Sequence, residues 1–482
     1  MGALFFPRSQ PAWRSTLPAQ IRPPAVMALP PTVTSSATAT LSRQFFPAAH
    51  NAYFNVPSMP LGGVFTISRT QPDAAPPGFA AVPGTTITNG TGAPNARGAM
   101  QVSFIHDGAS FELGVPSAQL GVLVRVDGEF VALTGPAVAT TTYQRYDFGS
   151  RKVRRIDLIG ANWWLASVGV GPTDAIYPAT VRGPRVICLG DSFTALGSDQ
   201  WQNWFADAMG WDDVWSSGIG GTGYVNNQSG TKKTFRARLQ SDVVAYKPDI
   251  VIIMGSVNDW SQPAAQVASE AAALVAELRA SLPGCLVIGA HACSGGVETM
   301  NSAALDVMDA TRSGFTAAGG IWLNPVQLPF GFNGPTAATL LSGAHAAGRP
   351  GNSGVPTAVA AGQGILVDAV VGGSANIRVG ATVEIGSGAT RERVHLTSFT
   401  QASPKALYGF DGALRYAHAS GEPVVEVGPS YMTGRGKAGT PTGWGTADLF
   451  VSSDGTHPTP EGQRALGMLL AQLVRSHIAG LR

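Results

Sequence analysis

The sequence predicts an α/β protein in which a three-layer α/β/α domain with a parallel sheet follows an all-β region and is interrupted by a small all-β insertion. From about residue 183, apolar strands alternate with helical patterns, which is typical of a parallel sheet covered by helices on both faces. Before residue 180, and again from about 345 to 430, short β-type runs punctuated by Gly and Pro replace this alternation. The length of 482 residues allows several domains with sizeable cores.

These changes of pattern divide the chain into five segments. We expect a Pro-rich extended arm at 1–50, an all-β sandwich of jelly-roll type at 51–180, the first part of the α/β domain at 181–344, the inserted β domain at 345–432, and the rest of the α/β domain at 433–482. The arm has no hydrophobic period. It is expected to dock on its own domain or on a neighbour, with a disordered leader as the alternative.

The β region carries one strong turn signal. Asp127 and Gly128 separate the alternating runs 122–126 and 129–133, and Asp-Gly between such runs predicts a tight hairpin. Further strands are expected at 143–148, 153–158 and 163–168 in this region, and at 364–370, 382–386, 393–396 and 423–427 in the insertion. Exposed aromatic residues of the β region could bind sugar rings, although core packing is the simpler role for them.

The α/β region contains short apolar runs and amphipathic segments in turn. Strands are expected at 186–189, 214–215, 250–254, 285–289 and 321–323, and helices at 202–209, 234–245, 264–282, 301–317 and 460–478. Because the carboxyl ends of parallel strands meet at one edge of the sheet, polar residues that follow these strands are the candidates for a functional site.

Composition excludes several classes of function. The net charge is +2 and only 13% of residues are charged, so the balance gives no sign of nucleic-acid binding. Three cysteines, Cys188, Cys285 and Cys293, are too few for a disulfide framework, and no Cys/His metal cluster is present. The first residues do not resemble a signal peptide, and no apolar run reaches transmembrane length. A virion-associated protein, or one that is extracellular after release, is favoured, with a cytoplasmic location as the alternative.

The motif that organises the α/β region is Gly190-Asp191-Ser192, directly after the strand at 186–189. A serine at such a turn exposes its hydroxyl at the carboxyl edge of the sheet. We expect the N-terminus of the next helix to lie beneath it, with free N–H groups and the positive end of the helix dipole. Taken alone, the motif is more simply explained as an ordinary connection in which Asp or Ser caps the helix.

Other residues at or near strand ends supply what an acyl-transfer site needs. His457 is of the residue type that most often acts as a general base and could activate Ser192, and Asp454 could orient its ring. The backbone N–H groups of Ser192 and Gly221 and the side-chain amide of Asn258 could stabilise an oxyanion. Gly218 and Gly220 are alternatives to Gly221, because the loop at 216–223 is rich in glycine. Each piece alone has a simpler reading, namely a surface turn, a flexible loop or a helix cap.

These residues together resemble the SGNH, or GDSL-type, hydrolase family. The resemblance covers about 183–330 and 440–482, and is strongest in Asp-Gly-Thr-His-Pro-Thr-Pro-Glu-Gly at 454–462. It implies an α/β/α esterase domain without metal or organic cofactor, with Ser192, His457 and Asp454 as the triad and Ser192, Gly221 and Asn258 as the oxyanion hole. Ser216 and Ser256 depart from the Asn and Gly that many members carry at these positions. Such enzymes cleave carboxylic esters or thioesters, often acetyl groups on glycans.

Three functions follow as hypotheses. The first is a serine esterase that removes O-acetyl groups from a surface polysaccharide, in line with the similarity of a β-sandwich placed ahead of such a domain to some carbohydrate acetylesterases. The second is a virion or cell-surface structural protein or adhesin that assembles as a homo-oligomer, or on a particle, through residues 1–50. The small domain at 345–432 loosely resembles β-domains of phage structural proteins. The third is a lipid esterase.

Overall fold

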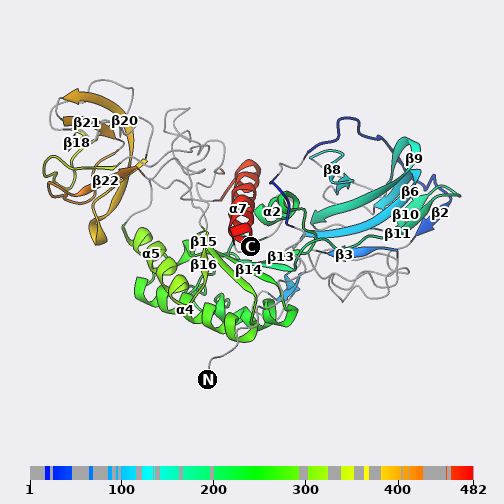
Figure 1. Cartoon of the computed structure of the whole chain (residues 1–482), viewed down its shortest axis with the longest axis horizontal. Helices are drawn as coiled ribbons and strands as arrows, with labels where there is room; N and C mark the ends of the chain where they lie inside the picture. Colours follow the sequence, from blue (N-terminus) through cyan, green and yellow to red (C-terminus); the bar gives the residue numbers. More distant parts are fainter. Residues whose placement is uncertain are drawn as a thin grey trace.

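The computed structural model describes residues 17–21, 25–45, 64–68, 85–88, 94–95, 99–115, 122–133, 135, 142–161, 165, 167–195, 200–291, 302–323, 338–351, 363–368, 382–402, 405–410, 412–426, 452 and 457–480. Among the described residues, a five-stranded parallel sheet lies at the centre of the molecule, a larger antiparallel sheet lies on one side, and a six-stranded sheet lies on the other (Figure 1).

The central sheet is parallel throughout and has the order β13-β12-β14-β15-β16. Its strands are β12 (Val186–Gly190), β13 (Val214–Gly218), β14 (Ile250–Gly255), β15 (Leu286–His291) and β16 (Ile321–Trp322). The first strand, β12, lies between β13 and β14, so the chain changes direction across the sheet at this point. In open α/β sheets, ligands bind outside the carboxyl ends of strands at such a switch.

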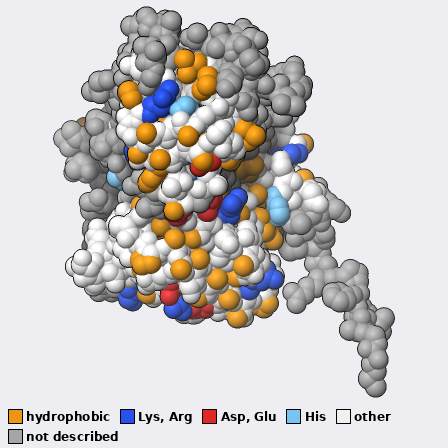
Figure 2. All heavy atoms as spheres, turned by 90° about the vertical axis from the view of Figure 1, so that its left-hand side faces the viewer, with side chains coloured by type: hydrophobic (Ala, Val, Ile, Leu, Met, Phe, Trp, Pro, Cys, Tyr) orange, Lys and Arg blue, Asp and Glu red, His pale blue; other side chains and the backbone are white. Residues whose placement is uncertain are grey.

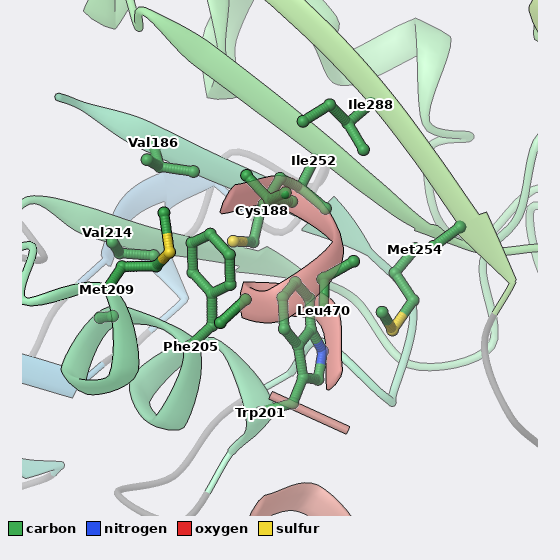
Figure 3. Packing of buried hydrophobic residues seen from close by; sticks show 14 of the residues in the cluster. Val186, Cys188, Trp201, Phe205, Met209, Val214, Ile252, Met254, Ile288 and Leu470 are labelled. Atoms are coloured by element: carbon green, nitrogen blue, oxygen red, sulfur yellow. The ribbon is translucent and has the colours of Figure 1, made fainter. Parts of the chain in front are cut away.

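Two hydrophobic cores cover the faces of this sheet. Alternate strand residues such as Val186 and Cys188 pack with helices α2 (Trp201–Met209) and α7 (Pro460–Gly480), as Figure 3 shows. The residues between them, such as Ile187 and Leu189, pack against α4 (Ala264–Ser281) and α5 (Ser302–Ala317) on the opposite face. Burial on both faces explains why the strands are continuous apolar runs.

One expected helix is interrupted. Residues 234–245 form two 3₁₀ turns, Arg236–Arg238 and Val244–Tyr246, on either side of a single α-helical turn, α3 (Leu239–Asp242). Val243 leaves the helical region with φ −130° and ψ −62°. Two adjacent β-branched valines weaken the helix at this point.

The N-terminal part forms a nine-stranded antiparallel sheet built on two long strands, β6 (Ala99–Val115) and β9 (Thr142–Ala161). The Asp127–Gly128 hairpin is confirmed between β7 (Leu123–Val126) and β8 (Glu129–Phe130), and both turn residues have positive φ, as a type I′ turn requires. The other strands are β1 (Thr32–Ser36), β2 (Arg43–Phe45), β3 (Thr66–Ser68), β10 (Ser167–Val170) and β11 (Ala175–Pro178), with a separate pair formed by β4 (Thr85–Thr88) and β5 (Pro94–Asn95). The sandwich expected for 51–180 stays a prediction.

The described part of the N-terminal arm docks on its own chain. Leu17 and Ile21 pack against the core beneath α7, and Arg475 of α7 donates to the carbonyl groups of Pro18 and Ala19. Further along, β1 pairs with β9 and β2 pairs with β10. The arm therefore connects the central domain to the antiparallel sheet, and two of its segments are strands of that sheet.

A buried ionic network joins the antiparallel sheet to the central domain. Arg125 of β7 donates to Asp157 of β9 at 3.0 Å and to Asp207 of α2 at 2.6 Å. Asp212, which follows α2, accepts from Arg155 at 2.9 Å and from Gln101 at 2.9 Å. Because the paired groups are almost fully buried, the two parts are held in one fixed arrangement and not by a flexible linker.

The inserted module is a six-stranded antiparallel sheet. Its strands are β17 (Ala338–Leu340), β18 (Ile365–Asp368), β19 (Thr382–Ile385), β20 (Glu392–Ala402), β21 (Lys405–Phe410) and β22 (Pro423–Glu426). Since β17 pairs with β22, the sheet begins N-terminal to residue 345, where the sequence placed the boundary. Arg391 contacts Asp309 of α5 and so ties the module to the central domain.

A histidine in this module predicts a pH dependence of its stability. His418 is fully buried between Glu392, at 2.8 Å, and Glu422, at 2.7 Å. Burial alone would lower the pKa of His418, but the two carboxylates outweigh it and raise the pKa. The stabilisation is therefore complete below the pKa of an unfolded histidine and is lost as pH rises through the higher pKa of the folded state.

We expect the melting temperature of the module to fall between pH 6 and pH 8 more steeply in the wild-type chain than in His418→Gln, which cannot titrate. Differential scanning calorimetry at several pH values measures both slopes. Equal slopes would contradict a charged His418 in the folded module.

The surface agrees with the low charge of the sequence. On the face drawn in Figure 2, charged side chains are scattered among uncharged ones. None of the helices in the described part of the chain has the length and apolar character needed to span a bilayer. Cys188 and Cys285 are free thiols, and Cys293 lies outside the described residues.

Candidate active site

The Gly190-Asp191-Ser192 turn lies at the carboxyl end of β12, as expected. Residues 191–195 form a turn in which the N–H groups of Thr194 and Ala195 donate to the Asp191 carbonyl, and α2 starts only at Trp201. The start of α2 agrees with the helix predicted over 202–209, and the position of its N-terminus beneath Ser192 stays a prediction. The turn itself orients Ser192, because the carboxylate of Asp191 accepts the Phe193 N–H at 3.0 Å.

Ser192 and His457 meet at this edge although 265 positions separate them in the chain. The Nε2 atom of His457 lies 2.8 Å from the Ser192 hydroxyl oxygen, which is hydrogen-bonding distance. The ring of Phe193 lies beside the imidazole with 5.2 Å between centroids. This is the contact that a base needs in order to take the proton of a serine nucleophile.

The start of α7 positions His457. Thr459 caps the helix by accepting the Gly462 N–H at 3.1 Å, and Pro460 occupies the first helical position. The carbonyl of His457 accepts the Ser452 N–H at 2.8 Å. Asp454, the predicted third member of the triad, lies outside the described residues, so its contact with His457 stays a prediction.

The glycine-rich loop after β13 lies against the nucleophile. Gly218 ends the strand, where a side chain would overlap the backbone of Thr194 and Ala195. A Cβ atom built on Gly220 would lie 3.5 Å from the Cβ of Ser192. Gly221 has φ +76°, a conformation that glycine adopts without strain. Within the described residues, no hydrogen bond occupies the N–H of Ser192 or of Gly221, the two predicted backbone donors of the oxyanion hole.

Asn258 lies opposite this loop in the 3₁₀ turn Val257–Asp259, directly after β14. Its amide donates one hydrogen to the Thr222 carbonyl at 3.0 Å, which leaves its second N–H for a ligand. Asp259 is buried and accepts the N–H groups of Tyr224, Val225 and Asn226 at 2.8 to 3.1 Å. Burial raises the pKa of Asp259, which these three bonds oppose. The loop and the turn are thus fixed to each other.

The two departures from the usual family pattern have structural explanations. The hydroxyl of Ser216 donates to the Thr194 carbonyl and accepts from Gln202 of α2. It therefore stabilises the turn at 191–195 that carries Ser192. Ser256 has φ +83°, the left-handed conformation that explains why glycine is common at this position.

A buried histidine holds Ser256 in that conformation. The Nε2 atom of His291 contacts the Met308 carbonyl at 3.0 Å, and its Nδ1 atom lies 2.9 Å from the Ser256 hydroxyl. Because a carbonyl only accepts, Nε2 carries the proton and the Ser256 hydroxyl donates to Nδ1. Burial lowers the pKa of His291 to about 4, so the ring is neutral at pH 7. This chain of hydrogen bonds fixes the start of the turn that carries Asn258.

Beneath the nucleophile turn, the guanidinium of Arg238 joins two strand ends. It donates to the carbonyl groups of Gly190 at 2.6 Å and Ser217 at 2.8 Å, and its partner Asp242 lies 3.1 Å away. Burial raises the pKa of Asp191 to about 7, and the neighbouring Asp259 acts in the same direction. The backbone N–H of Phe193 and the charge of Arg238 oppose this shift.

The sequence did not identify Lys232, Arg238, Ser256 or His291 as parts of the site. Arg238 and Lys232 carry no motif, and only the position of Ser256 in the family pattern was a signal. No three His, Cys, Asp or Glu side chains converge on a metal position in the portion of the chain that the structure covers.

Comparison with known proteins gives one family match. Residues 188–322 match the GDSL-like Lipase/Acylhydrolase family. This segment contains Ser192, Gly221 and Asn258 and ends before Asp454 and His457. No curated protein sequence matches the chain at a significant level.

Solved structures with a similar arrangement are distant in sequence. Salicylyl-acyltransferase SsfX3 from a tetracycline biosynthetic pathway is 12% identical with a TM-score of 0.44, and the alignment covers 60% of this chain and 86% of that chain. A family 2 carbohydrate esterase with a carbohydrate-binding domain from Corynascus thermopiles (Myceliophthora fergusii) is 15% identical with a TM-score of 0.37, covering 48% and 84%. A family two carbohydrate esterase from Cellvibrio japonicus is 15% identical with a TM-score of 0.36, covering 48% and 80%. The family match alone places a GDSL-like lipase/acylhydrolase domain at residues 188–322, the segment that contains nearly all of the parallel sheet.

Proposed function

We propose that the chain is a serine esterase that hydrolyses carboxylic esters through an acyl-enzyme. The observation that carries this proposal is the 2.8 Å contact between His457 Nε2 and the Ser192 hydroxyl at the carboxyl edge of the sheet. A serine with a base in contact is the arrangement that activates an otherwise weak nucleophile. The proposed oxyanion donors, which follow the three adjacent strands β13, β12 and β14, complete the requirements for acyl transfer.

The mechanism follows from the positions of these groups. His457 takes the proton of Ser192 as its oxygen attacks the ester carbonyl. The tetrahedral oxyanion accepts hydrogen bonds from the N–H groups of Ser192 and Gly221 and from the free N–H of Asn258. His457 then protonates the leaving alcohol, and water attacks the acyl-enzyme with the same base. In this proposal, Asp454 orients the imidazole through its second nitrogen.

For the substrate, we propose O-acetyl groups on a neutral polysaccharide. A groove of about 830 Å³ lies on the antiparallel sheet between β1 and the hairpin of β7 and β8. Its described lining has balanced charge and a few apolar side chains: Asp127, Glu129, Asp147, Arg145, Lys152 and Arg154, with Met27, Leu29, Val126 and Phe148. Such a wall offers both donors and acceptors without net charge, which suits a neutral polyhydroxylated chain.

The ionic network around Arg125 holds this groove in a fixed position relative to Ser192. The β region could therefore orient a long substrate over the hydrolase domain. The comparisons give no support to the likeness of the inserted module to phage proteins. A homo-oligomer formed through residues 1–50 stays a hypothesis that the mass of the purified chain in solution tests. Assembly on a particle stays a hypothesis as well.

The acyl preference separates the two esterase hypotheses. We expect the highest kcat/KM with p-nitrophenyl acetate, a steady fall through the butyrate, octanoate and laurate esters, and release of acetate from acetylated polysaccharides. A maximum at octanoate or laurate would contradict the glycan deacetylase and support a lipid esterase. Absence of Ser192-dependent hydrolysis across the panel would contradict both hypotheses.

A further inference from the structure

Lys232 makes a charged hydrogen bond to the loop that lies against the nucleophile. Its ammonium donates to the Gly220 carbonyl at 2.6 Å, and the side chain is partly buried. That carbonyl belongs to the same peptide group as the Gly221 N–H. A trans peptide is planar and points its C=O and N–H in opposite directions. Lys232 therefore lies on the far side of the peptide from the N–H that is the proposed oxyanion donor.

We propose that Lys232 is a positioning residue of the oxyanion hole, because it fixes the orientation of the Gly220–Gly221 peptide. This role rests on the proposed esterase function. The ammonium holds the peptide plane in one orientation, so the Gly221 N–H stays directed at the position of the oxyanion. A positive charge on the carbonyl also draws electron density from the amide and makes its N–H a stronger donor.

Hydrogen bonds within the loop at 226–232 hold Lys232 in position for this contact. The Lys232 N–H donates to the Asn227 carbonyl at 3.0 Å, and Asn227 also accepts the Gly230 N–H on its side chain at 2.9 Å. One residue earlier, Asn226 donates to the Asn258 carbonyl at 2.7 Å. The loop that carries Lys232 is thus bonded to the turn that carries Asn258. The Lys232 side chain has one partner on the glycine loop, the Gly220 carbonyl.

The bond from Lys232 is expected to stabilise the transition state more than the bound substrate. A ground-state ester carbonyl carries little charge, whereas the oxyanion carries a full one, so a stronger donor lowers the barrier more than it strengthens substrate binding. Loss of the ammonium should therefore lower kcat and leave KM nearly unchanged. Because the Gly221 N–H remains, the loss should be smaller than the 10²- to 10³-fold that removal of a whole donor costs.

The chain offers a matched control in Lys233, which is exposed. Lys232→Met and Lys233→Met remove the same charge from adjacent positions, and only the first removes the bond to Gly220. On p-nitrophenyl acetate we expect Lys232→Met to lower kcat roughly 10-fold, Lys233→Met to match the wild type, and Lys232→Arg to recover part of the loss. Melting temperatures of all three variants should stay close to that of the wild type.

The outcomes distinguish failure of the proposed role of Lys232 from failure of the proposed esterase function. Equal kcat for Lys232→Met and Lys233→Met in a chain with Ser192-dependent hydrolysis would overturn the role of Lys232 alone. A loss in Lys232→Met that appears only as a higher KM, or that Lys232→Arg does not reduce, would also overturn it. A wild-type chain whose hydrolysis survives Ser192→Ala would overturn the proposed function and, with it, this inference.

Discussion

Replacing Ser192 with alanine is expected to lower kcat for p-nitrophenyl acetate by roughly 10⁴- to 10⁶-fold, because no acyl-enzyme can form without its hydroxyl. Residual hydrolysis should come from water held near His457 and the oxyanion donors. Steady-state kinetics measures the loss. Mass spectrometry after mixing with a fluorophosphonate should show one adduct on the wild-type chain and none on the variant.

The variant should fold normally, since Ser192 is partly exposed and alanine leaves the turn at 191–195 intact. Ser281→Ala is the matched control, because Ser281 is exposed at the end of α4, on the opposite face of the sheet from α2 and α7. It should keep full activity. An active Ser192→Ala variant with an unchanged circular dichroism spectrum would refute the assignment of the nucleophile.

Much of the central domain was predictable because its signals are local. Strands buried on both faces must be continuous apolar runs, so β12 and β14 are visible in the sequence. Parallel strands end at one edge, and the sequence therefore predicts that Ser192, the glycine loop and Asn258 lie close together. Ser192 and His457 lie in hydrogen-bonding contact across the length of the domain, and their catalytic roles stay predictions.

The supporting contacts were not predictable because they depend on tertiary packing. Whether Lys232 reaches the Gly220 carbonyl depends on how the loop from 226 to 232 folds, and the same composition would suit any surface loop. His291 ends an ordinary apolar strand, and its partner Ser256 directly follows the neighbouring strand β14. Propensity also favoured a continuous helix over 234–245, although the chain bends there and Arg238 lies buried beneath the strand ends.

Replacing Arg238 with methionine is expected to destabilise the central domain by about 3–5 kcal/mol. Arg238 is fully buried, and four described acceptors share its guanidinium: the Gly190 and Ser217 carbonyl groups, the Ser217 hydroxyl and the Asp242 carboxylate. Methionine fills a similar volume but removes these four bonds, and it leaves Asp242 as a buried charge that keeps only the hydroxyl groups of Ser217 and Ser241 as donors. Chemical unfolding followed by tryptophan fluorescence measures the change.

Arg236 is the matched control, because it lies two residues away on the surface and pairs with Glu270 at 2.8 Å. An exposed pair of this kind contributes about 0–1 kcal/mol, so Arg236→Met should be nearly neutral. The double variant Arg238→Met/Asp242→Leu should recover part of the loss, since it removes the buried carboxylate together with its partner. If Arg238→Met proved as mild as Arg236→Met, the guanidinium could not be what holds the ends of β12 and β13 beneath Ser192.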